Sequence, residues 1–258
     1  MTRQHKGFTL IELIIVMVIV SILATMTTDI ITLPVKSYID LERRTTLVDT
    51  AEISLRRMQR DIRRALPNSI RITGGNTLEL LHTTDGGRYR AKPSGDILNF
   101  SIADNSFDVL GSLHAIPRGE LVVYNLGSIG ANAYAGDNRA SIDNTSTINK
   151  IILSPAKLFP FSSPQQRFFI VDTPITYTCI GSELRRYDNR IDAGYTIGGS
   201  TSGLLYKLQA KTDVISCVFS YDEGSATRAG LVTLEITLTD EVGESAKLIH
   251  QVHVDNMP

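Results

Sequence analysis

The apolar run from Phe8 to Thr28 limits what this chain can fold into more than any other feature, because it is of membrane length and contains one ionisable residue, Glu12. As a helix, its 21 residues would span roughly 32 Å at about 1.5 Å per residue, and the hydrocarbon core of a bilayer is about 30 Å thick. An acidic residue inside such a helix costs about 2.5 to 3.5 kcal/mol on insertion-based scales, so it usually has a partner or a task. The run therefore predicts a transmembrane helix in which Glu12 has a function.

Proteolysis near the start of the chain would supply a cationic partner for Glu12. If the peptide bond after Gly7 is cut, the new α-amino group of Phe8 lies four residues from Glu12, or within reach of the same carboxylate on a neighbouring chain. Chains packed side by side would then neutralise two charges at once.

The residues around this position resemble a known processing signal. The leader from Met1 to Gly7 and the following Phe8-Thr9-Leu10-Ile11-Glu12-Leu13 are similar to the class III signal of type IV pilins and type II secretion pseudopilins. In that superfamily a prepilin peptidase cuts after the glycine and methylates the new N-terminal phenylalanine, and the glutamate guides subunit docking into a filament. The resemblance implies Gly7 as the cleavage residue, Phe8 as the methylated terminus and Glu12 as the assembly carboxylate.

Two later stretches carry a narrower resemblance. Residues 55–69, which are rich in arginine, and residues 168–179 resemble the large minor pilin of the mannose-sensitive haemagglutinin (MSHA) pilus system, which is itself similar to the J-type minor pseudopilin of type II secretion. This implies as partners the prepilin peptidase, other minor and major pilins through the N-terminal helix, and the inner-membrane assembly platform. It implies no cofactor.

The charges on either side of the apolar run predict its orientation. Arg3 and Lys6 precede the run and Asp29 is the first charge after it, so the N-terminus should be cytoplasmic. The rest of the chain would then lie outside the inner membrane, in what the resemblance implies is the periplasm. The alternative is an ordinary secretory signal that is cut away, but the length of the run and the presence of Glu12 argue against it.

Cys179 and Cys217 are the only cysteines of the chain. In an oxidising periplasm an even pair is normally bridged, so we expect a disulfide. Two buried free thiols are the alternative. The spacing contains no CxxC motif, which makes a zinc or redox site an unlikely use of these residues.

Beyond the membrane the helix should continue as an amphipathic segment, because apolar residues recur every three or four positions. This stripe, which should pack on a sheet, consists of Leu47, Ala51, Leu55, Met58, Ile62 and Leu66. The other faces carry Arg56, Arg57, Arg60, Arg63 and Arg64, which should face solvent or a neighbouring subunit. Pro34 should bend or interrupt the helix, and Pro67 should end it.

After Pro67, short apolar runs separated by turn residues predict β structure. The expected strands are 77–82, 97–102, 120–126, 150–153, 167–171, 176–180, 183–187, 213–221, 231–239 and 246–254. Gly74-Gly75 and Gly86-Gly87 are interpreted as hairpin turns, and residues 240–244 as the turn before the last strand. Residues 127–149 and 194–203 are polar and long enough to be mobile loops.

The sequence offers little that points to catalysis or metal binding. Net charge is −1 with 21% charged residues, which gives no footprint for nucleic acid. Among the histidines only His250 and His253 are close, and on a strand they would point to opposite faces. Oxygen ligands at Asp137-Asn138 and Asp143-Asn144 match no EF-hand, so solvated turns are the preferred interpretation over calcium. We expect no catalytic residue, no cofactor and no metal.

These features together predict an α+β, pilin-like fold in which a long N-terminal transmembrane helix packs its periplasmic half on an antiparallel β-sheet domain. Its segments are a leader peptide at 1–7, the transmembrane half of the helix at 8–28, its periplasmic half at 29–66 and a periplasmic β-rich domain, or two small lobes, at 67–258.

The expected function is a minor pilin precursor for assembly, initiation or tip formation of an MSHA-like type IV pilus, held in the inner membrane and possessing no catalysis. A J-type pseudopilin of type II secretion is the first alternative. A membrane-anchored adhesin or ligand-binding module, with residues 127–149 as its binding loop, is the second.

Overall fold

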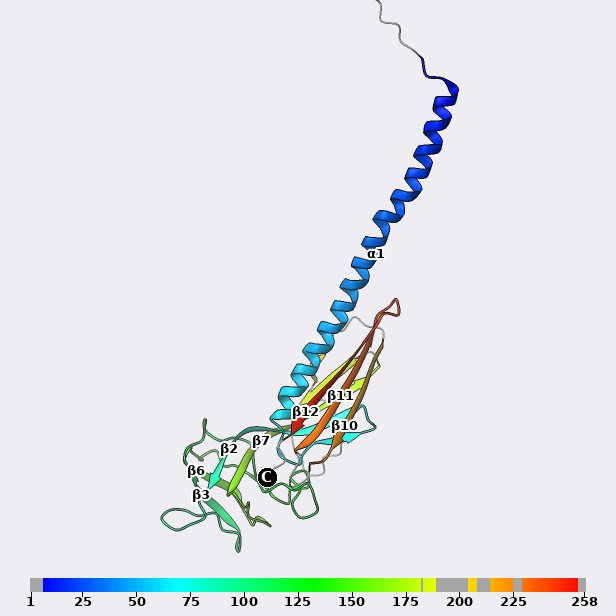
Figure 1. Ribbon diagram of the computed structural model, residues 1–258. Helices are drawn as coiled ribbons and strands as arrows, with labels where there is room; N and C mark the ends of the chain where they lie inside the picture. Colours follow the sequence, from blue (N-terminus) through cyan, green and yellow to red (C-terminus); the bar gives the residue numbers. More distant parts are fainter. Residues whose placement is uncertain (1–6, 182, 189–203, 208–213, 225–228, 255–258) are drawn as a thin grey trace, which may run out of the picture. The chain divides into compact units, whose positions relative to one another are not determined.

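The computed structural model describes residues 7–181, 183–188, 204–207, 214–224 and 229–254. The chain forms two compact units, Met1–Thr46 and Leu47–Pro258. The described residues contain one long helix and twelve strands (Figure 1). Every strand pair is antiparallel, so the fold is α+β, as the sequence predicts.

The strands form two sheets. The larger sheet has the order β5-β4-β7-β2-β3-β6, with β1 beside β2, β8 beside β7 and β9 beside β8, and the smaller has the order β10-β11-β12. The bounds are β1 (Arg71–Thr73), β2 (Thr77–Tyr89), β3 (Asp104–Leu110), β4 (Glu120–Val123), β5 (Arg139–Ser141), β6 (Lys150–Lys157), β7 (Arg167–Ile180), β8 (Glu183–Asp188), β9 (Leu204–Lys207), β10 (Val214–Asp222), β11 (Gly230–Thr239) and β12 (Ser245–Val254).

The helix α1 runs from Leu10 to Arg63 without a break. Of the two outcomes expected at Pro34, a bend or an interruption, the interruption is therefore wrong. Proline removes one backbone donor, so the carbonyl four residues earlier loses its hydrogen-bond partner. The many good helix formers on either side nevertheless keep the segment helical.

The end of α1 also differs from the prediction, since the helix stops at Arg63 rather than at Leu66. The backbone that follows the helix pairs with strand β2. Ala65 forms a bridge with His82, and the N–H of Leu66 donates to the carbonyl of Leu81 at 2.8 Å. Pairing with a strand therefore ends the helix before Pro67 does.

Most of the predicted strands are present, and the main error lies between residues 97 and 110. The segment 97–102 is not a strand, and β3 follows it at Asp104–Leu110. The short strands β1, β5 and β9 were not predicted. The two strands expected at 167–171 and 176–180 are one strand, β7.

The two predicted glycine turns have different outcomes. Gly74-Gly75 joins β1 to β2 as a tight turn, with positive φ at both residues, which only glycine adopts at little cost. Gly86-Gly87 lies inside β2 and is paired with Phe169 and Phe168 of β7, so the turn expected there is wrong.

One of the two segments expected as mobile loops needs a correction. Residues 127–149 contain β5, and Ala133 and Tyr134 from this segment are buried in a small hydrophobic cluster. Residues 194–203 lie outside the described residues. The turn 240–244 does join β11 to β12, where the carboxylate of Asp240 accepts the N–H groups of Val242 and Glu244.

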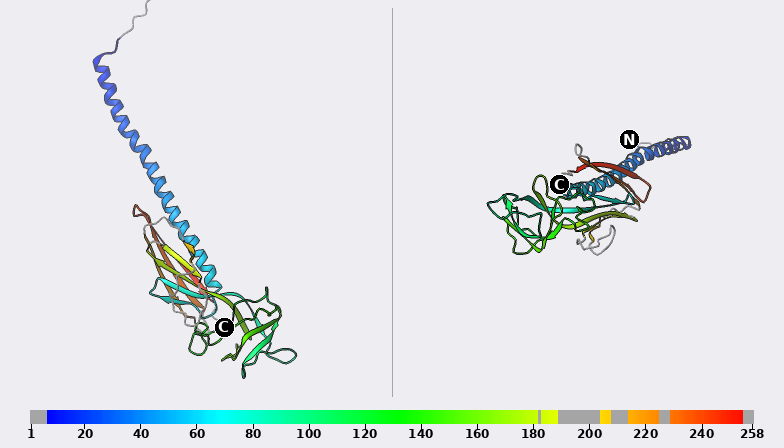
Figure 2. Two further views of the ribbon diagram at one scale, coloured as in Figure 1. Left: turned by 180° about the vertical axis from the view of Figure 1, so that it is seen from behind. Right: turned by 90° about the horizontal axis from the view of Figure 1, so that it is seen from below.

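The unit from Leu47 onward has two main hydrophobic cores, which the long strands β2 and β7 both enter (Figures 1 and 2). The first core lies between residues 47–63 of α1 and both sheets. All six residues of the predicted helical stripe are buried, with at most 4% exposure, which confirms the stripe. The second core, around Phe107 and Phe168, is formed mainly by β3, β4, β6 and the first half of β7.

Cys179 of β7 and Cys217 of β10 form a disulfide, with Cα atoms 6.0 Å apart, as predicted. Because these strands belong to different sheets, the bond joins the two sheets on which the helix packs.

Candidate functional site

The N-terminal segment holds the three residues to which the sequence assigns a role. Gly7, Phe8 and Glu12 are all exposed, and α1 begins two residues after Phe8. Glu12 is the acidic residue of the first helical turn, where the helix dipole stabilises a negative charge. This position lowers the cost of the carboxylate in an otherwise apolar segment.

Thr9 is a residue that the sequence reasoning missed. It precedes the helix, and its side-chain oxygen accepts the backbone N–H of Glu12 at 3.4 Å, while its carbonyl accepts the same N–H at 3.2 Å. Thr9-Leu10-Ile11-Glu12 has the T-x-x-E pattern of a capping box, so the spacing alone could have indicated a helix start here. Through its backbone N–H, Glu12 thus takes part in the N-terminal cap of the helix, and it also belongs to the processing signal.

The first half of α1 has no apolar partner within the described residues of its unit. Each large apolar side chain from Leu10 to Leu23 is 48% exposed or more. The helix is long and apolar enough to cross a membrane. A helix that is apolar on all sides is stable in lipid or against other apolar helices, and not in water.

The second half of α1 is fastened to the larger sheet by a polar contact as well as by its apolar stripe. The carboxylate of Asp61 accepts a hydrogen bond from the Tyr177 hydroxyl at 2.6 Å and pairs with the Arg186 guanidinium at 2.9 Å. Tyr177 and Arg186 are opposite each other on β7 and β8, which places both donors under the helix.

This contact changes the ionisation of its members. Burial, together with the negative charge of Asp61, raises the pKa of Tyr177 well above its ordinary value. For Arg186 burial acts in the opposite direction, but the Asp61 carboxylate prevails and raises its pKa. The arginine therefore stays charged and the tyrosine stays neutral.

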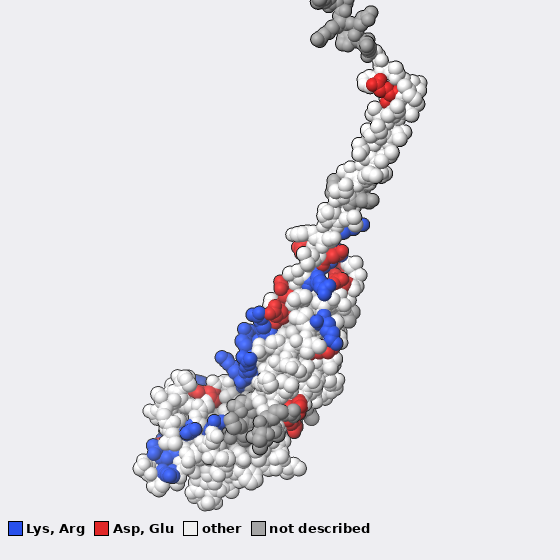
Figure 3. Space-filling model, in the orientation of Figure 1, with Lys and Arg blue, Asp and Glu red and all other residues white. Residues whose placement is uncertain are grey.

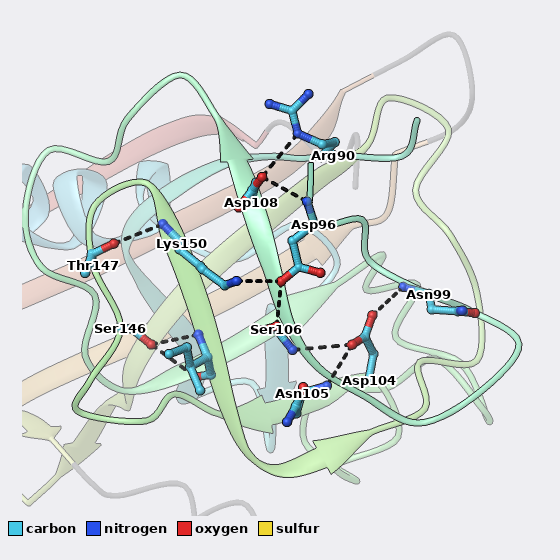
Figure 4. Close-up of polar contacts among 11 residues, drawn as sticks. Arg90, Asp96, Asn99, Asp104, Asn105, Ser106, Asp108, Ser146, Thr147 and Lys150 are labelled. Carbon is cyan, nitrogen blue, oxygen red and sulfur yellow. Dashed lines mark hydrogen bonds and ion pairs between the residues drawn. The ribbon is translucent and has the colours of Figure 1, made fainter. Parts of the chain in front are cut away.

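A group of carboxylates in and beside β3, shown in Figure 4, organises the loop that precedes this strand. Asp96 pairs with Lys150 at 2.9 Å and accepts the Ser106 hydroxyl at 2.6 Å, and Asp108 accepts the N–H of Asp96 and pairs with Arg90 at 3.5 Å. Burial alone would raise the pKa of Asp96, but the bonds from Lys150 and Ser106 lower it. The Asp104 carboxylate accepts the backbone N–H of Asn99 at 2.7 Å, so side-chain carboxylates bind the backbone within and beside residues 97–102, which form no strand.

The two aspartates considered for calcium bind neighbouring groups of the chain. Asp137 accepts the backbone N–H groups of Gly130 and Asn132, and Asp143 accepts the backbone N–H and the side-chain hydroxyl of Thr145. His250 is half-buried and His253 is exposed, on alternate sides of β12. In the described part of the chain no group of three or more His, Cys, Asp or Glu side chains is placed to hold a metal.

Comparison with known proteins identifies the N-terminal segment. Residues 2–28 match the family described as the prokaryotic N-terminal methylation motif. No curated protein and no solved structure matches the chain. The match supports a type IV pilin-like or pseudopilin precursor, and the motif implies processing by a prepilin peptidase.

Proposed function

We propose that this chain is the precursor of a minor pilin, cut after Gly7 and methylated at the new N-terminus, Phe8. The observation that carries the proposal is the match of residues 2–28 to the methylation motif, which ends where the uncharged part of α1 ends. The exposed apolar surface of that part supports anchoring in the inner membrane. With Arg3 and Lys6 before it, the N-terminus is cytoplasmic and the sheets are periplasmic.

Assembly in this proposal uses the first half of α1. The carboxylate of Glu12 is exposed and therefore available to the Phe8 amine of an adjoining subunit. Exposed apolar residues on all sides of the helix suit packing against other pilin helices. The chain has a structural role and performs no catalysis of its own.

The pilus system is the finer part of the proposal. The arginine-rich end of α1 and residues 168–179 resemble the large minor pilin of the MSHA system, and a J-type pseudopilin of type II secretion is the alternative. Deleting the gene distinguishes them: loss of surface pili with normal protein secretion supports the pilus role, and the reverse result supports the secretion role.

Mass spectrometry of the chain, expressed with and without a prepilin peptidase, tests the processing. The mature protein should lack residues 1–7 and carry one added methyl group on Phe8, and Gly7→Leu should remain uncut. A mature chain that still begins with Met1 would refute the proposal.

Glu12→Ala tests assembly separately from processing. This variant should be cut and inserted normally, but it should be lost from purified filaments because the Phe8 amine has no partner. If Glu12→Ala enters filaments as the parent chain does, the charge-pairing role is wrong although the processing stands.

A further inference from the structure

The globular unit contains an open groove of about 920 Å³ where the end of α1 meets β2 and β7. Four arginines line it: Arg63 and Arg64 from the helix, Arg88 from β2 and Arg167 from β7. Figure 3 shows Lys and Arg side chains, in blue, gathered along the lower part of the helix. The chain as a whole has a net charge of −1, so this basic groove is a local feature.

The fold forces these positive charges together. Arg88 and Arg167 are directly opposite each other in the β2–β7 pair, and like charges at such positions destabilise a sheet. The N–H of Thr83 donates to the carbonyl of Arg64 at 2.8 Å, which holds the helix end and its two arginines against β2. The strand register and this hydrogen bond therefore bring arginines from three elements to one groove.

The acidic residues near the groove are already engaged. Asp85 accepts the backbone N–H groups of Gly86 and His114 and contacts the His114 ring at 3.2 Å. Asp172 accepts the Thr173 N–H and pairs with His82 at 3.0 Å. Within the described residues, Arg63, Arg64 and Arg88 form no salt bridge at all.

The backbone of β2 is irregular at the same place. Its register against β7 shifts between Leu81 and Thr83 and again between Thr83 and Asp85. Such bulges redirect side chains and are common beside binding sites. The hydroxyl oxygen of Thr83 is buried and has no hydrogen-bond partner among the described residues, and Thr83 lines the groove.

We propose that the groove binds a carboxylate-bearing segment of a partner protein. A guanidinium group binds a carboxylate through two parallel hydrogen bonds, and arginines from three elements could hold two or more acidic side chains. The volume greatly exceeds the roughly 30 Å³ that one water occupies, which suits a peptide better than a single ion. Phe169, which is only partly buried, adds apolar surface for the rest of such a segment.

The inference rests on the globular unit and holds whether or not the chain is processed as a pilin. The test uses the full chain in a neutral detergent and a fluorescein-labelled peptide, Glu-Leu-Asp-Glu-Phe-Asp, whose binding is followed by anisotropy. A peptide with Gln and Asn in place of Glu and Asp is the uncharged comparison.

Three variants of the groove are compared with one control. Arg88→Gln, and the double change Arg63→Gln with Arg64→Gln, should each weaken binding of the acidic peptide at least about tenfold, because each removes at least one charge-assisted hydrogen bond. Thr83→Val, which keeps the side-chain shape, should weaken it about threefold. Arg56→Gln is the control, because Arg56 lies on the same helix but is paired with Glu52.

Thermal unfolding separates binding from folding. Arg88→Gln removes the repulsion from Arg167, so its free chain should be at least as stable as the parent chain. The proposal is overturned if the uncharged peptide binds equally well, or if the groove variants bind the acidic peptide as tightly as Arg56→Gln does. It is also overturned if inorganic phosphate, or nanodiscs of phosphatidylglycerol, bind at the arginines while the acidic peptide does not.

Discussion

The two halves of α1 are one continuous helix, yet they have opposite surroundings. From Leu10 to Leu23 every large apolar side chain is exposed, whereas from Leu47 to Ile62 the apolar stripe is buried against both sheets. The first half is apolar on all sides and the second is apolar on one side, so the pattern of the residues, rather than helix formation itself, decides what each half contacts.

Because their surroundings differ, the two halves of α1 should affect different properties: the second half the stability of the globular unit, and the first half the assembly that we propose. Side chains of the second half contribute to the free energy of unfolding of the globular unit, because they are buried there in the isolated chain. Side chains of the first half have no such contacts, so their apolar surface is available to lipid and to other subunits. Mutations in the two halves should therefore change different measurements.

The largest expected effect follows from Leu55→Ala. Leu55 is buried in the first core, and truncation of a buried leucine leaves a cavity, so the globular unit should lose about 4 kcal/mol of stability. Denaturant unfolding of the full chain in detergent measures this loss.

The matched control is Leu23→Ala, which makes the same chemical change in the first half. Because Leu23 is exposed, the free energy of unfolding of the globular unit should not change. A loss of similar size in both variants would remove the distinction between the halves.

The disulfide should give the next largest effect. It joins the sheets that cover the second half of α1, so replacement of both Cys179 and Cys217 by alanine should cost about 3 kcal/mol. Hydrogen exchange should also become faster in residues 47–63, with no change in residues 10–46. Equal acceleration along the whole helix would show that the two halves are coupled.

Asp61→Asn should cost about 2 kcal/mol. Asparagine can still accept the Tyr177 hydrogen bond, but Arg186 loses the negative charge that compensates its burial. Glu52→Gln is a suitable control, because its pair with Arg56 on the same helix is solvent-exposed and worth little. If both variants lose the same stability, Asp61 is not an anchor.

The second half of the helix shows how much of this fold a sequence can predict. The spacing of the stripe from Leu47 to Ile62 depends on helix geometry alone, and these residues are all buried. Leu66, the last predicted member, is also buried but lies beyond the end of the helix. The alternation in β11 is equally local and is present as predicted. The disulfide followed from the count of two cysteines and the expected compartment.

Features that depend on distant residues could not be predicted in this way. Asp61 finds Arg186 across 125 positions of sequence, and nothing local marks either as a partner. The opposition of Arg88 and Arg167 requires the register of β2 on β7, which includes two irregularities. Residues 97–102 look like a strand in isolation, but Asp104 and Asp108 bind the backbone N–H groups of Asn99 and Asp96 in or beside the segment.

The candidate site at Gly7, Phe8 and Glu12 could be predicted from the sequence, because a peptidase recognises a processing signal as a linear sequence.

The smallest expected effect concerns pH and the contact between Tyr177 and Asp61. The pKa of Tyr177 is raised in the folded chain, so above pH 10, its ordinary value, the unfolded chain loses the proton while the folded chain retains it. The contribution of Tyr177 to stability is thus complete below pH 10 and declines as the pH rises further. Tyr177→Phe has no proton to lose, so its stability should fall less steeply above pH 10, by about 1.4 kcal/mol less per pH unit at most. Parallel stability-against-pH curves for the two proteins between pH 9 and 11 would show that burial and the Asp61 carboxylate do not raise the pKa of Tyr177.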